Sequence, residues 1–167
     1  HNSYENVDHA VVEDFGNEWQ QFDQSAMSSE EREYYFDTYF SIFPWNELPH
    51  DSFGFDAGCG SGRWALIAAP RVGHIHCVEP STAINIARKN LQNLSNCSFH
   101  QCTISDMPFS DNSMDFGYSL GVLHHIPDTQ RGIDDCVRKL KPGAPFLVYL
   151  YYAFDNQPFW FRWIWRI

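Results

Sequence analysis

Three glycines at alternate positions are the feature of this sequence that most clearly predicts chemistry. They are Gly58, Gly60 and Gly62, and they follow a short apolar run that ends in Asp56. The pattern predicts a buried strand, a tight turn and a helix that begins near Arg63. Glycines in such a turn allow positive φ angles and a close approach of a ligand, and the helix behind it turns its N–H groups toward that ligand. We therefore expect a nucleotide-type ligand at this turn.

The spacing of the glycines distinguishes between nucleotides. A dinucleotide site uses G-x-G-x-x-G, in which the third glycine packs the helix against the strand. Here Arg63 occupies that third position, and Gly62 comes one residue earlier. The segment Asp56-Ala57-Gly58-Cys59-Gly60-Ser61-Gly62-Arg63 resembles motif I of the class I S-adenosylmethionine-dependent methyltransferases, particularly the methyltransferase type 11 group. The resemblance implies S-adenosylmethionine as cofactor, S-adenosylhomocysteine as product, and cofactor contacts from Asp56, Ala57, Gly58, Cys59, Gly60 and Gly62.

Further segments in the family's order extend the resemblance over about residues 52–151. Glu79 comes 23 residues after Asp56, at the end of the second expected strand, and the resemblance implies that Glu79 and the following Pro80 contact the cofactor. An acid there suits a ribose diol, because one carboxylate accepts from two hydroxyls. The other matching segments are residues 105–109, 113–119, 123–128 and 140–143.

The resemblance also implies roles for residues that follow the third and fourth expected strands. Asp106 would accept from the adenine amino group, with the Met107 backbone beside the ring. The other interpretation of Asp106 is an aspartate that initiates a turn. Leu120 and Gly121 would line the methionine part of the pocket, because open α/β sheets bind ligands beyond the carboxyl ends of their strands.

Methyl transfer from a sulfonium is an in-line displacement, so the enzyme must mainly align nucleophile and methyl group. A base is needed only where the acceptor loses a proton. The family has no universal catalytic residue, and this sequence shows none. His124 and His125 follow the fourth expected strand and are candidates for a general base. The other interpretation is that both histidines cap or orient the next helix.

Alternating strands and helices must position these residues. We expect strands near 53–57, 74–79, 98–103, 114–120 and 145–151, and helices near 63–69, 80–91 and 129–140. This order predicts parallel βαβ units. The expected fold is α/β, a Rossmann-like doubly wound and mostly parallel sheet without the helix and two strands that end the family fold. It carries an N-terminal helical addition.

The N-terminal addition covers residues 1–51, the cofactor-binding domain 52–152 and an aromatic tail 153–167. Apolar residues at helical spacing, Val12, Phe15, Trp19 and Phe22, predict a first helix. A second begins at the capping box of Ser28 and Glu31 and continues to about Phe43, with its aromatic face formed by Tyr35, Phe36, Tyr39, Phe40 and Phe43. We expect residues 1–27 to form a lid over the pocket; the alternative is a fixed structural addition.

The tail is interpreted as the start of a truncated core helix. Its tryptophans, with Arg162 and Arg166, leave a membrane-interface helix as the alternative. The sequence contains no run of about 18 apolar residues, which is the length that would predict a membrane-spanning helix.

Charge and cysteines limit the partners. The net charge is −10, and residues 1–50 hold eleven acidic residues and one basic residue. This argues against a nucleic-acid partner, which requires basic clusters. The five cysteines include no C-x-x-C pair, which favours reduced thiols and a cytoplasmic location. We expect no metal, although His74 and His76 alternate on an expected strand.

The sequence leaves three hypotheses for function. The first is a methyltransferase that acts on a small-molecule acceptor. The second is a nicotinamide-dependent oxidoreductase, against which Arg63 counts. The third is a non-catalytic cofactor-binding module, consistent with the missing strands. The acceptor, the methylated atom and the oligomeric state stay open.

Overall fold

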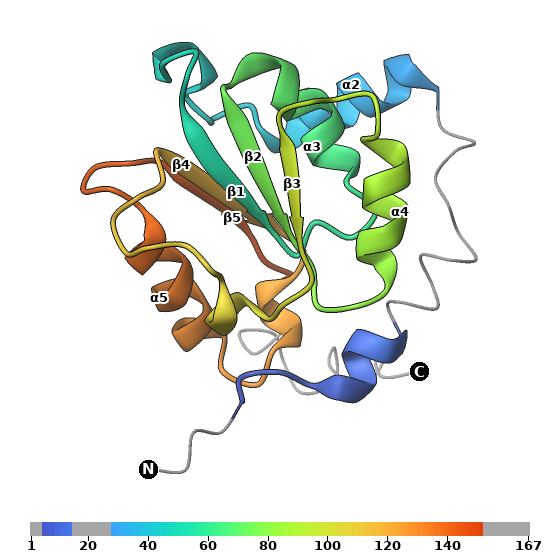
Figure 1. Ribbon diagram of the computed structural model, residues 1–167, viewed down its shortest axis with the longest axis vertical. Coiled ribbons are helices and arrows are strands. Elements are labelled where there is room, and N and C mark those ends of the chain that lie inside the picture. The colour runs from blue at the N-terminus through green and yellow to red at the C-terminus, as the bar shows by residue number, and fades with distance from the viewer. Residues whose placement is uncertain (1–4, 15–27, 152–167) are drawn as a thin grey trace, which may run out of the picture.

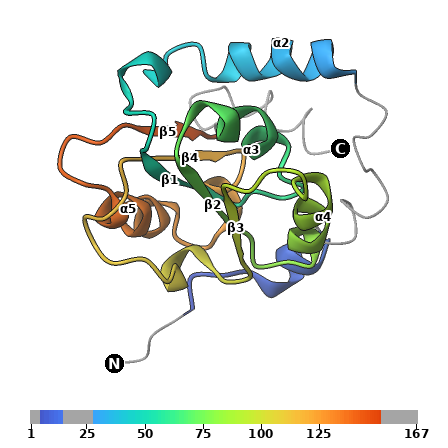
Figure 2. The ribbon, with the colours of Figure 1, turned by 45° about the horizontal axis from the view of Figure 1, so that its top comes forward.

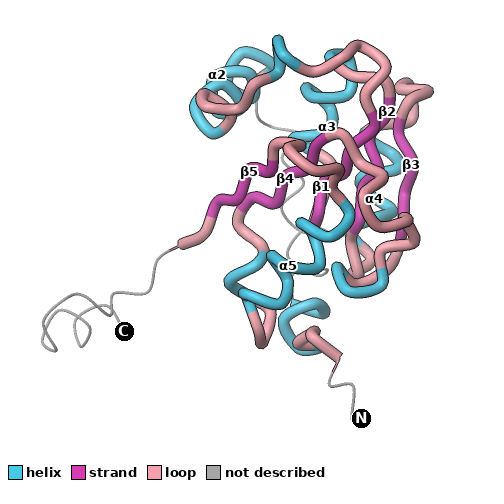
Figure 3. Tube along the Cα trace, turned by 90° about the vertical axis from the view of Figure 1, so that its left-hand side faces the viewer, coloured by secondary structure: helices cyan, strands magenta, loops and turns pink. Residues whose placement is uncertain are grey.

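Five short apolar segments form one parallel sheet in the computed structural model, which describes residues 5–14 and 28–151. The strands are β1 (Phe53–Ala57), β2 (His74–Val78), β3 (Cys97–His100), β4 (Phe116–Leu120) and β5 (Phe146–Tyr149). Their order across the sheet is β3-β2-β1-β4-β5, which Figure 3 shows from β3 at one edge to β5 at the other. The predicted α/β parallel sheet is confirmed.

Helices cover both faces of this sheet. The longer helices are α2 (Ser29–Tyr39), α3 (Arg63–Ala68), α4 (Ala83–Asn90) and α5 (Thr129–Lys139). Single 3-10 turns are η2 (Trp45–Glu47), η3 (Ala69–Arg71), η4 (Ile104–Asp106) and η5 (Leu123–His125). The buried residues of α2 and α3, with Ile84 and Ala87 of α4, belong to one hydrophobic cluster, and Cys136 of α5 belongs to another. Figure 2 accordingly shows α2 and α5 on opposite sides of the sheet.

The first strand in sequence occupies the centre of the sheet. Asp56 pairs with Cys77 of β2 on one side and with Tyr118 of β4 on the other. The carboxyl ends of all five parallel strands therefore meet at one edge, which is where open α/β sheets bind ligands. Figure 1 shows the N-terminal segment, residues 5–14, lying across that edge. Residues 9–14 of this segment are helical.

An aromatic cluster attaches α2 to the sheet. The predicted capping box is present, because Glu31 N donates to Ser28 Oγ and Ser28 N donates to Glu31 Oε2. Phe36 stacks on Phe40 with ring centroids 4.3 Å apart, and Phe40 meets the Tyr118 ring edge-on at 5.0 Å. These contacts fix α2 on the face of the sheet that carries α3.

The expected end of this helix was wrong. The helix stops at Tyr39, because Phe40 leaves the helical conformation with φ −100° and ψ 13°. A turn in which Phe43 N donates to Phe40 O then brings the Phe43 ring back to the same cluster. Tyr35 does not belong to the buried face, since 46% of it is exposed.

Three expected strands are shorter than predicted by two residues or more, and the fifth strand covers only Phe146–Tyr149. The third strand ends at His100, and the predicted residues 101–103 lead instead into the 3-10 turn η4. The fourth strand begins at Phe116, while Met114 makes only an isolated bridge to Leu140. Hydrophobic periodicity extends past both ends because Ile104 and Met114 are buried although neither belongs to a strand.

Several predictions lie outside the described residues. These are the helix through Phe15, Trp19 and Phe22 and the aromatic tail 153–167. Within residues 5–14 and 28–151, no helix is both long and apolar enough to cross a membrane. All five cysteines lie in the described part of the chain, and none forms a disulfide.

Candidate cofactor site

Packing explains why the first residue of the turn must be glycine. Gly58 has φ +77°, and a Cβ built there would lie 2.5 Å from both Cγ atoms of Val122. The N–H groups of Gly58 and Cys59 both donate to Val78 O, at 2.8 and 3.0 Å, which ties the turn to the end of β2. A side chain at Gly58 would therefore meet both a backbone conformation that disfavours it and a neighbour without space.

Glu79 is held against the glycine turn by its own hydrogen bonds. Its Oε2 accepts from Gly60 N at 3.1 Å, and its Oε1 accepts from Ser81 N at 3.0 Å. Only 8% of the residue is exposed, and it lies in the wall of a cavity. A carboxylate offers about four lone-pair sites, so each oxygen keeps capacity for a further donor. The carboxylate is thus fixed in place and still able to accept from ligand hydroxyl groups.

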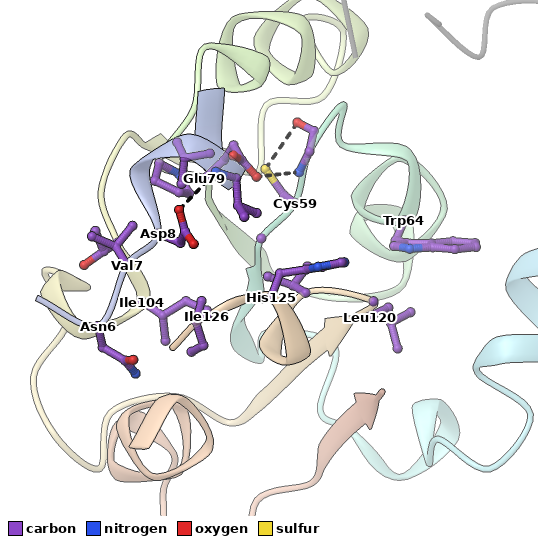
Figure 4. A pocket seen from close by; sticks show the side chains of 18 of the residues that line it. Asn6, Val7, Asp8, Cys59, Trp64, Glu79, Ile104, Leu120, His125 and Ile126 are labelled. Carbon is purple, nitrogen blue, oxygen red and sulfur yellow. Dashed lines mark hydrogen bonds between the residues drawn. The ribbon is translucent and has the colours of Figure 1, made fainter. Parts of the chain in front are cut away.

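The cavity has a volume of about 250 Å³ and opens at the carboxyl edge of the sheet. Figure 4 shows Asn6, Val7 and Asp8 approaching it from the N-terminal segment, opposite Trp64 and Leu120. Most of the cofactor residues implied by the family resemblance line it together with one candidate base: Gly58, Cys59, Gly60, Glu79, Pro80, Leu120, Gly121 and His125. The structure therefore brings these residues to one place.

Asp56, Ala57 and Gly62 lie outside the cavity wall. Asp56 and Ala57 are buried in β1, and burial raises the pKa of Asp56 to about 8, although the neighbouring Tyr118 side chain opposes the shift. Gly62 precedes α3 and packs against Leu91 of the α4 end, 2.9 Å from the position of an added Cβ. These three residues belong to the strand and the helix start that flank the turn, and their direct contact with a cofactor stays a prediction.

Asp106 and Met107 also lie outside the wall. Asp106 is exposed, and its Oδ2 accepts from Thr103 Oγ1 at 2.6 Å. Met107 is buried in the cluster beneath α5. The neighbouring Thr103 and Ile104 do line the cavity, so the loop borders the site. An adenine contact by Asp106 stays a prediction.

The two candidate bases differ in position. His125 lines the cavity, whereas His124 does not; their rings are 3.9 Å apart, and His124 meets the Tyr151 ring edge-on at 4.9 Å. Burial lowers the pKa of both imidazoles, and His125 lowers that of His124 further. Both rings are therefore neutral at pH 7 and have a nitrogen lone pair that can accept a proton.

Arg63 lines the cavity, although the sequence did not predict it as a cofactor-binding residue. It is the only lysine or arginine among the described residues of the wall. Its guanidinium lies over the Trp64 ring at 4.2 Å from the centroid. Burial lowers its pKa, while Tyr39, Asp56 and Tyr151 oppose this. Since arginine titrates far above neutral pH, the wall carries one cation.

Other wall residues were not predicted individually as site residues, namely Asn6, Val7, Asp8, Val11, Val12, Trp64, Thr103, Ile104, Val122, Ile126 and Tyr151. Trp64 and Ile104 could have been suspected, since each is close in sequence to a predicted site residue. Asn6 and Asp8 fall within residues 1–27, the expected lid, but no sequence pattern singled out these two side chains.

The histidines on β2 pair with β3 instead of forming a recognisable metal centre. His76 Nδ1 lies 3.1 Å from His100 Nε2, and His74 Nε2 lies 2.8 Å from Ser98 Oγ. No group of three histidine, cysteine or acidic side chains within the described ranges is arranged to hold a metal ion.

Comparisons with known proteins agree with this geometry. Residues 55–148 match a family model described as "Methyltransferase domain". The probable tRNA methyltransferase 9B of Bos taurus is 29% identical over 99 residues, 58% of this chain and 20% of that protein. The 2-phytyl-1,4-naphtoquinone methyltransferase of a Nostoc strain is 31% identical over 114 residues, 62% of this chain and 48% of that protein. The chain thus spans less than half the length of these relatives.

Solved structures show the same fold. The YcgJ protein of Bacillus subtilis aligns with a TM-score of 0.63 and 25% identity, over 75% of this chain and 52% of that one. A geranyl diphosphate C-methyltransferase of Streptomyces coelicolor, solved with S-adenosyl-L-homocysteine, has a TM-score of 0.59 and 19% identity over 71% and 43% of the two chains. With the family match over more than half of its length, the chain belongs to the class I S-adenosylmethionine-dependent methyltransferases.

Proposed function

We propose that this chain binds S-adenosylmethionine in the cavity at the carboxyl edge of the sheet and transfers its methyl group to a small-molecule acceptor. The observation that carries the proposal is the pair of hydrogen bonds that hold Glu79 to Gly60 and Ser81. They place a buried carboxylate at the rim of a turn in which Gly58 leaves no space for a side chain. The carboxylate matches the ribose diol of the cofactor, and the glycine turn allows the methionine part of the cofactor to approach the backbone closely.

The proposed roles of the wall residues follow from their chemistry. The cofactor supplies a methyl group activated by its sulfonium. Glu79 accepts hydrogen bonds from the ribose hydroxyls, and Arg63 provides a positive charge for the carboxylate of the cofactor's methionine part. Leu120 and Gly121 border the reacting end at the close of β4. These residues bind and orient, which is the main requirement of an in-line displacement.

His125 is the proposed proton acceptor where the acceptor must lose a proton. It faces the cavity, and its lowered pKa keeps it neutral at pH 7. His124 packs between His125 and Tyr151, which suits a residue that orients its neighbour. We expect His125→Ala to lower kcat and leave the Kd for S-adenosylhomocysteine nearly unchanged, as measured by initial rates and calorimetry.

A small-molecule acceptor is supported by the form and charge of the site. The cavity is bordered by Val7, Val11, Val12 and Ile126 and holds one cation in its described wall. A tRNA acceptor would require a basic surface, whereas the chain has a net charge of −10. Both tRNA and small-molecule methyltransferases occur among the relatives, so the acceptor must be tested.

Two measurements test the proposal. Calorimetry with S-adenosylmethionine, S-adenosylhomocysteine and NAD should show binding of the first two only. NAD binding without a response to S-adenosylhomocysteine would favour the oxidoreductase. Transfer of a labelled methyl group to a panel of quinones, sterols, phosphoethanolamine and tRNA then identifies the acceptor class. Binding without transfer to any acceptor would favour the non-catalytic module, and transfer to tRNA would contradict the small-molecule part.

The organisation of the chain is part of the proposal. Residues 1–51 form an N-terminal addition and 52–152 the cofactor-binding domain, and 153–167 are a separate aromatic segment. α2 attaches the addition to the cofactor-binding domain, because Phe36 and Phe40 pack in the hydrophobic cluster of the sheet. A cytoplasmic location is supported by the five unpaired thiols, which are usual in reducing compartments.

A further inference from the structure

One side-chain amide joins the N-terminal segment to the start of α5. Asn6 Nδ2 donates to Asp128 O, and Asp128 N donates to Asn6 Oδ1, and both hydrogen bonds are 2.8 Å long. The two residues are 122 positions apart in sequence, and only 8% of Asn6 is exposed. The side-chain amide thus pairs with both the N–H and the C=O group of Asp128, as a residue on a neighbouring β-strand would. Asparagine can do this because its side chain carries a donor and an acceptor side by side.

The contact connects two walls of the cavity. After Asn6, the chain contributes Val7, Asp8 and then Val11 and Val12 to the wall. Asp8 Oδ1 accepts from the N–H groups of Ala10 and Val11, at 3.1 and 3.3 Å, and so starts the helical turn that presents the two valines. The amide contact therefore fixes the origin of this wall.

On the other side, Asp128 ends the loop that carries the candidate base. His125 and Ile126 of this loop line the cavity opposite the N-terminal segment. Asp128 also begins α5, since its own Oδ1 accepts from Arg131 N at 2.9 Å. That bond is independent of Asn6, so α5 keeps its cap when Asn6 is replaced.

We propose that Asn6 is a positioning residue for the cofactor site, whose amide clamps the N-terminal segment to Asp128 and so closes the wall over the bound cofactor. The inference rests on the proposed function for the identity of the ligand. Loss of this side chain removes both described hydrogen bonds between the segment and Asp128, while the sheet and the glycine turn stay intact. Loss of Asn6 should therefore raise the dissociation rate of the ligand more than it lowers the association rate.

Asn96 provides a matched control. Its Nδ2 donates to Ala69 O at 2.8 Å and to Val72 O at 3.1 Å, so it also joins distant backbone with two hydrogen bonds. It is partly buried and does not line the cavity. An asparagine that merely stabilises the fold should behave as Asn96 does, whereas a positioning residue should affect ligand binding.

The experiment uses the whole chain in three variants, Asn6→Ala, Asn6→Asp and Asn96→Ala. Calorimetry and stopped-flow binding of S-adenosylhomocysteine give Kd and the dissociation rate, and thermal unfolding gives stability. We expect both Asn6 variants to raise Kd about tenfold through faster dissociation. Aspartate keeps the shape of asparagine but lacks the donor and turns an anionic oxygen toward Asp128 O. Asn96→Ala should lower the melting temperature and leave Kd unchanged.

Hydrogen exchange without ligand gives a readout independent of binding. Both Asn6 variants should exchange faster at residues 8–14, with strands β1 and β4 unchanged. An Asn6 variant that binds S-adenosylhomocysteine like the parent chain, or that keeps parent-like exchange at residues 8–14, would overturn the inference. If the parent chain binds no S-adenosylhomocysteine, the proposed function fails, and the exchange measurement still decides whether Asn6 holds the segment.

Discussion

The two principal walls of the cavity are built in different ways. The glycine turn is part of the sheet: Gly58 and Cys59 bond to the end of β2, and Gly58 fits against Val122 with no space for a side chain. The N-terminal segment crosses the same edge, but its described link to α5 is the side chain of Asn6. One wall depends on backbone and packing, and the other depends on a replaceable side chain.

This difference separates the recognition of a cofactor from the closing of its site. Backbone groups within a packed sheet move little, so the turn holds its shape with or without a ligand. A short surface segment makes fewer buried contacts and opens at a smaller free-energy cost. We therefore expect substitutions in the turn to abolish binding and substitutions in the segment to weaken it. The following predictions test this order through the affinity for S-adenosylhomocysteine.

Gly58→Ala should have the largest effect. The added methyl group requires a left-handed backbone conformation and contacts Val122 at 2.5 Å, so binding should fall below detection by calorimetry. Gly143→Ala is the control, because Gly143 has φ +84° but no atom within 4 Å of an added Cβ. It should cost only about 1 kcal/mol of stability, from backbone strain alone.

The double variant Gly58→Ala/Val122→Ala separates strain from packing. Removing the Val122 methyl groups makes space for the new Cβ, so part of the affinity should return. If Gly58→Ala alone binds like the parent chain, the turn is not a rigid wall, and the comparison fails.

Glu79→Gln should have the second largest effect. The amide keeps one acceptor but turns an NH₂ group toward the N–H of Gly60 or Ser81, both of which donate to the carboxylate. We expect the affinity to fall by about 1–3 kcal/mol, the range for hydrogen bonds to charged groups. Calorimetry measures it, with Asp111→Asn as the control for loss of a surface charge. A Kd within a factor of two of the parent would remove Glu79 from the site.

Val11→Ala in the N-terminal segment should have a smaller effect. Val11 is half-buried in the cavity wall, so losing two methyl groups should raise Kd by about twofold to fivefold. The same calorimetry detects it. A loss as large as that of Glu79→Gln would mean that both walls contribute equally to recognition.

Acid pH should lower the stability of the fold and, of all these changes, have the smallest effect on ligand affinity. Burial, together with His74 and His100, lowers the pKa of His76 to about 4. In the unfolded chain the pKa of His76 is about 6.5, so below this pH the unfolded chain binds more protons than the folded one. The free energy of unfolding therefore falls as the pH drops from about 6.5 toward 4. Urea unfolding at several pH values should show this, with a weaker slope in His76→Asn.

The histidines lie on β2 and β3, away from both cavity walls, and Phe109 packs against His76 and His100. His76→Asn should therefore leave the Kd for S-adenosylhomocysteine unchanged at both pH 6.5 and pH 7.5. A large difference in Kd between these two pH values, abolished by His76→Asn, would show that this face of the sheet is linked to the site.

The sequence predicted the parts of the site whose signal is local. Gly58, Gly60 and Glu79 lie in short motifs in which strand, turn and helix follow one another, so their spacing carries the geometry. The end of α2 was missed because the Phe43 ring rejoins the aromatic cluster through a turn, which imitates helical periodicity. Asn6 could not be singled out from the sequence, because its two hydrogen bonds depend on a residue 122 positions further along the chain.

The central position of β1 has a consequence for how the chain folds. β1 pairs with β2, which is close in sequence, but also with β4, which begins more than fifty residues later. The cavity therefore forms only after the chain has closed a long loop, a slow step in parallel sheets. A partly folded chain that lacks β4 has no wall at Leu120, Gly121 or Val122. The cofactor should thus bind only chains that have finished folding, and should protect them by mass action from proteases that cleave the intermediates.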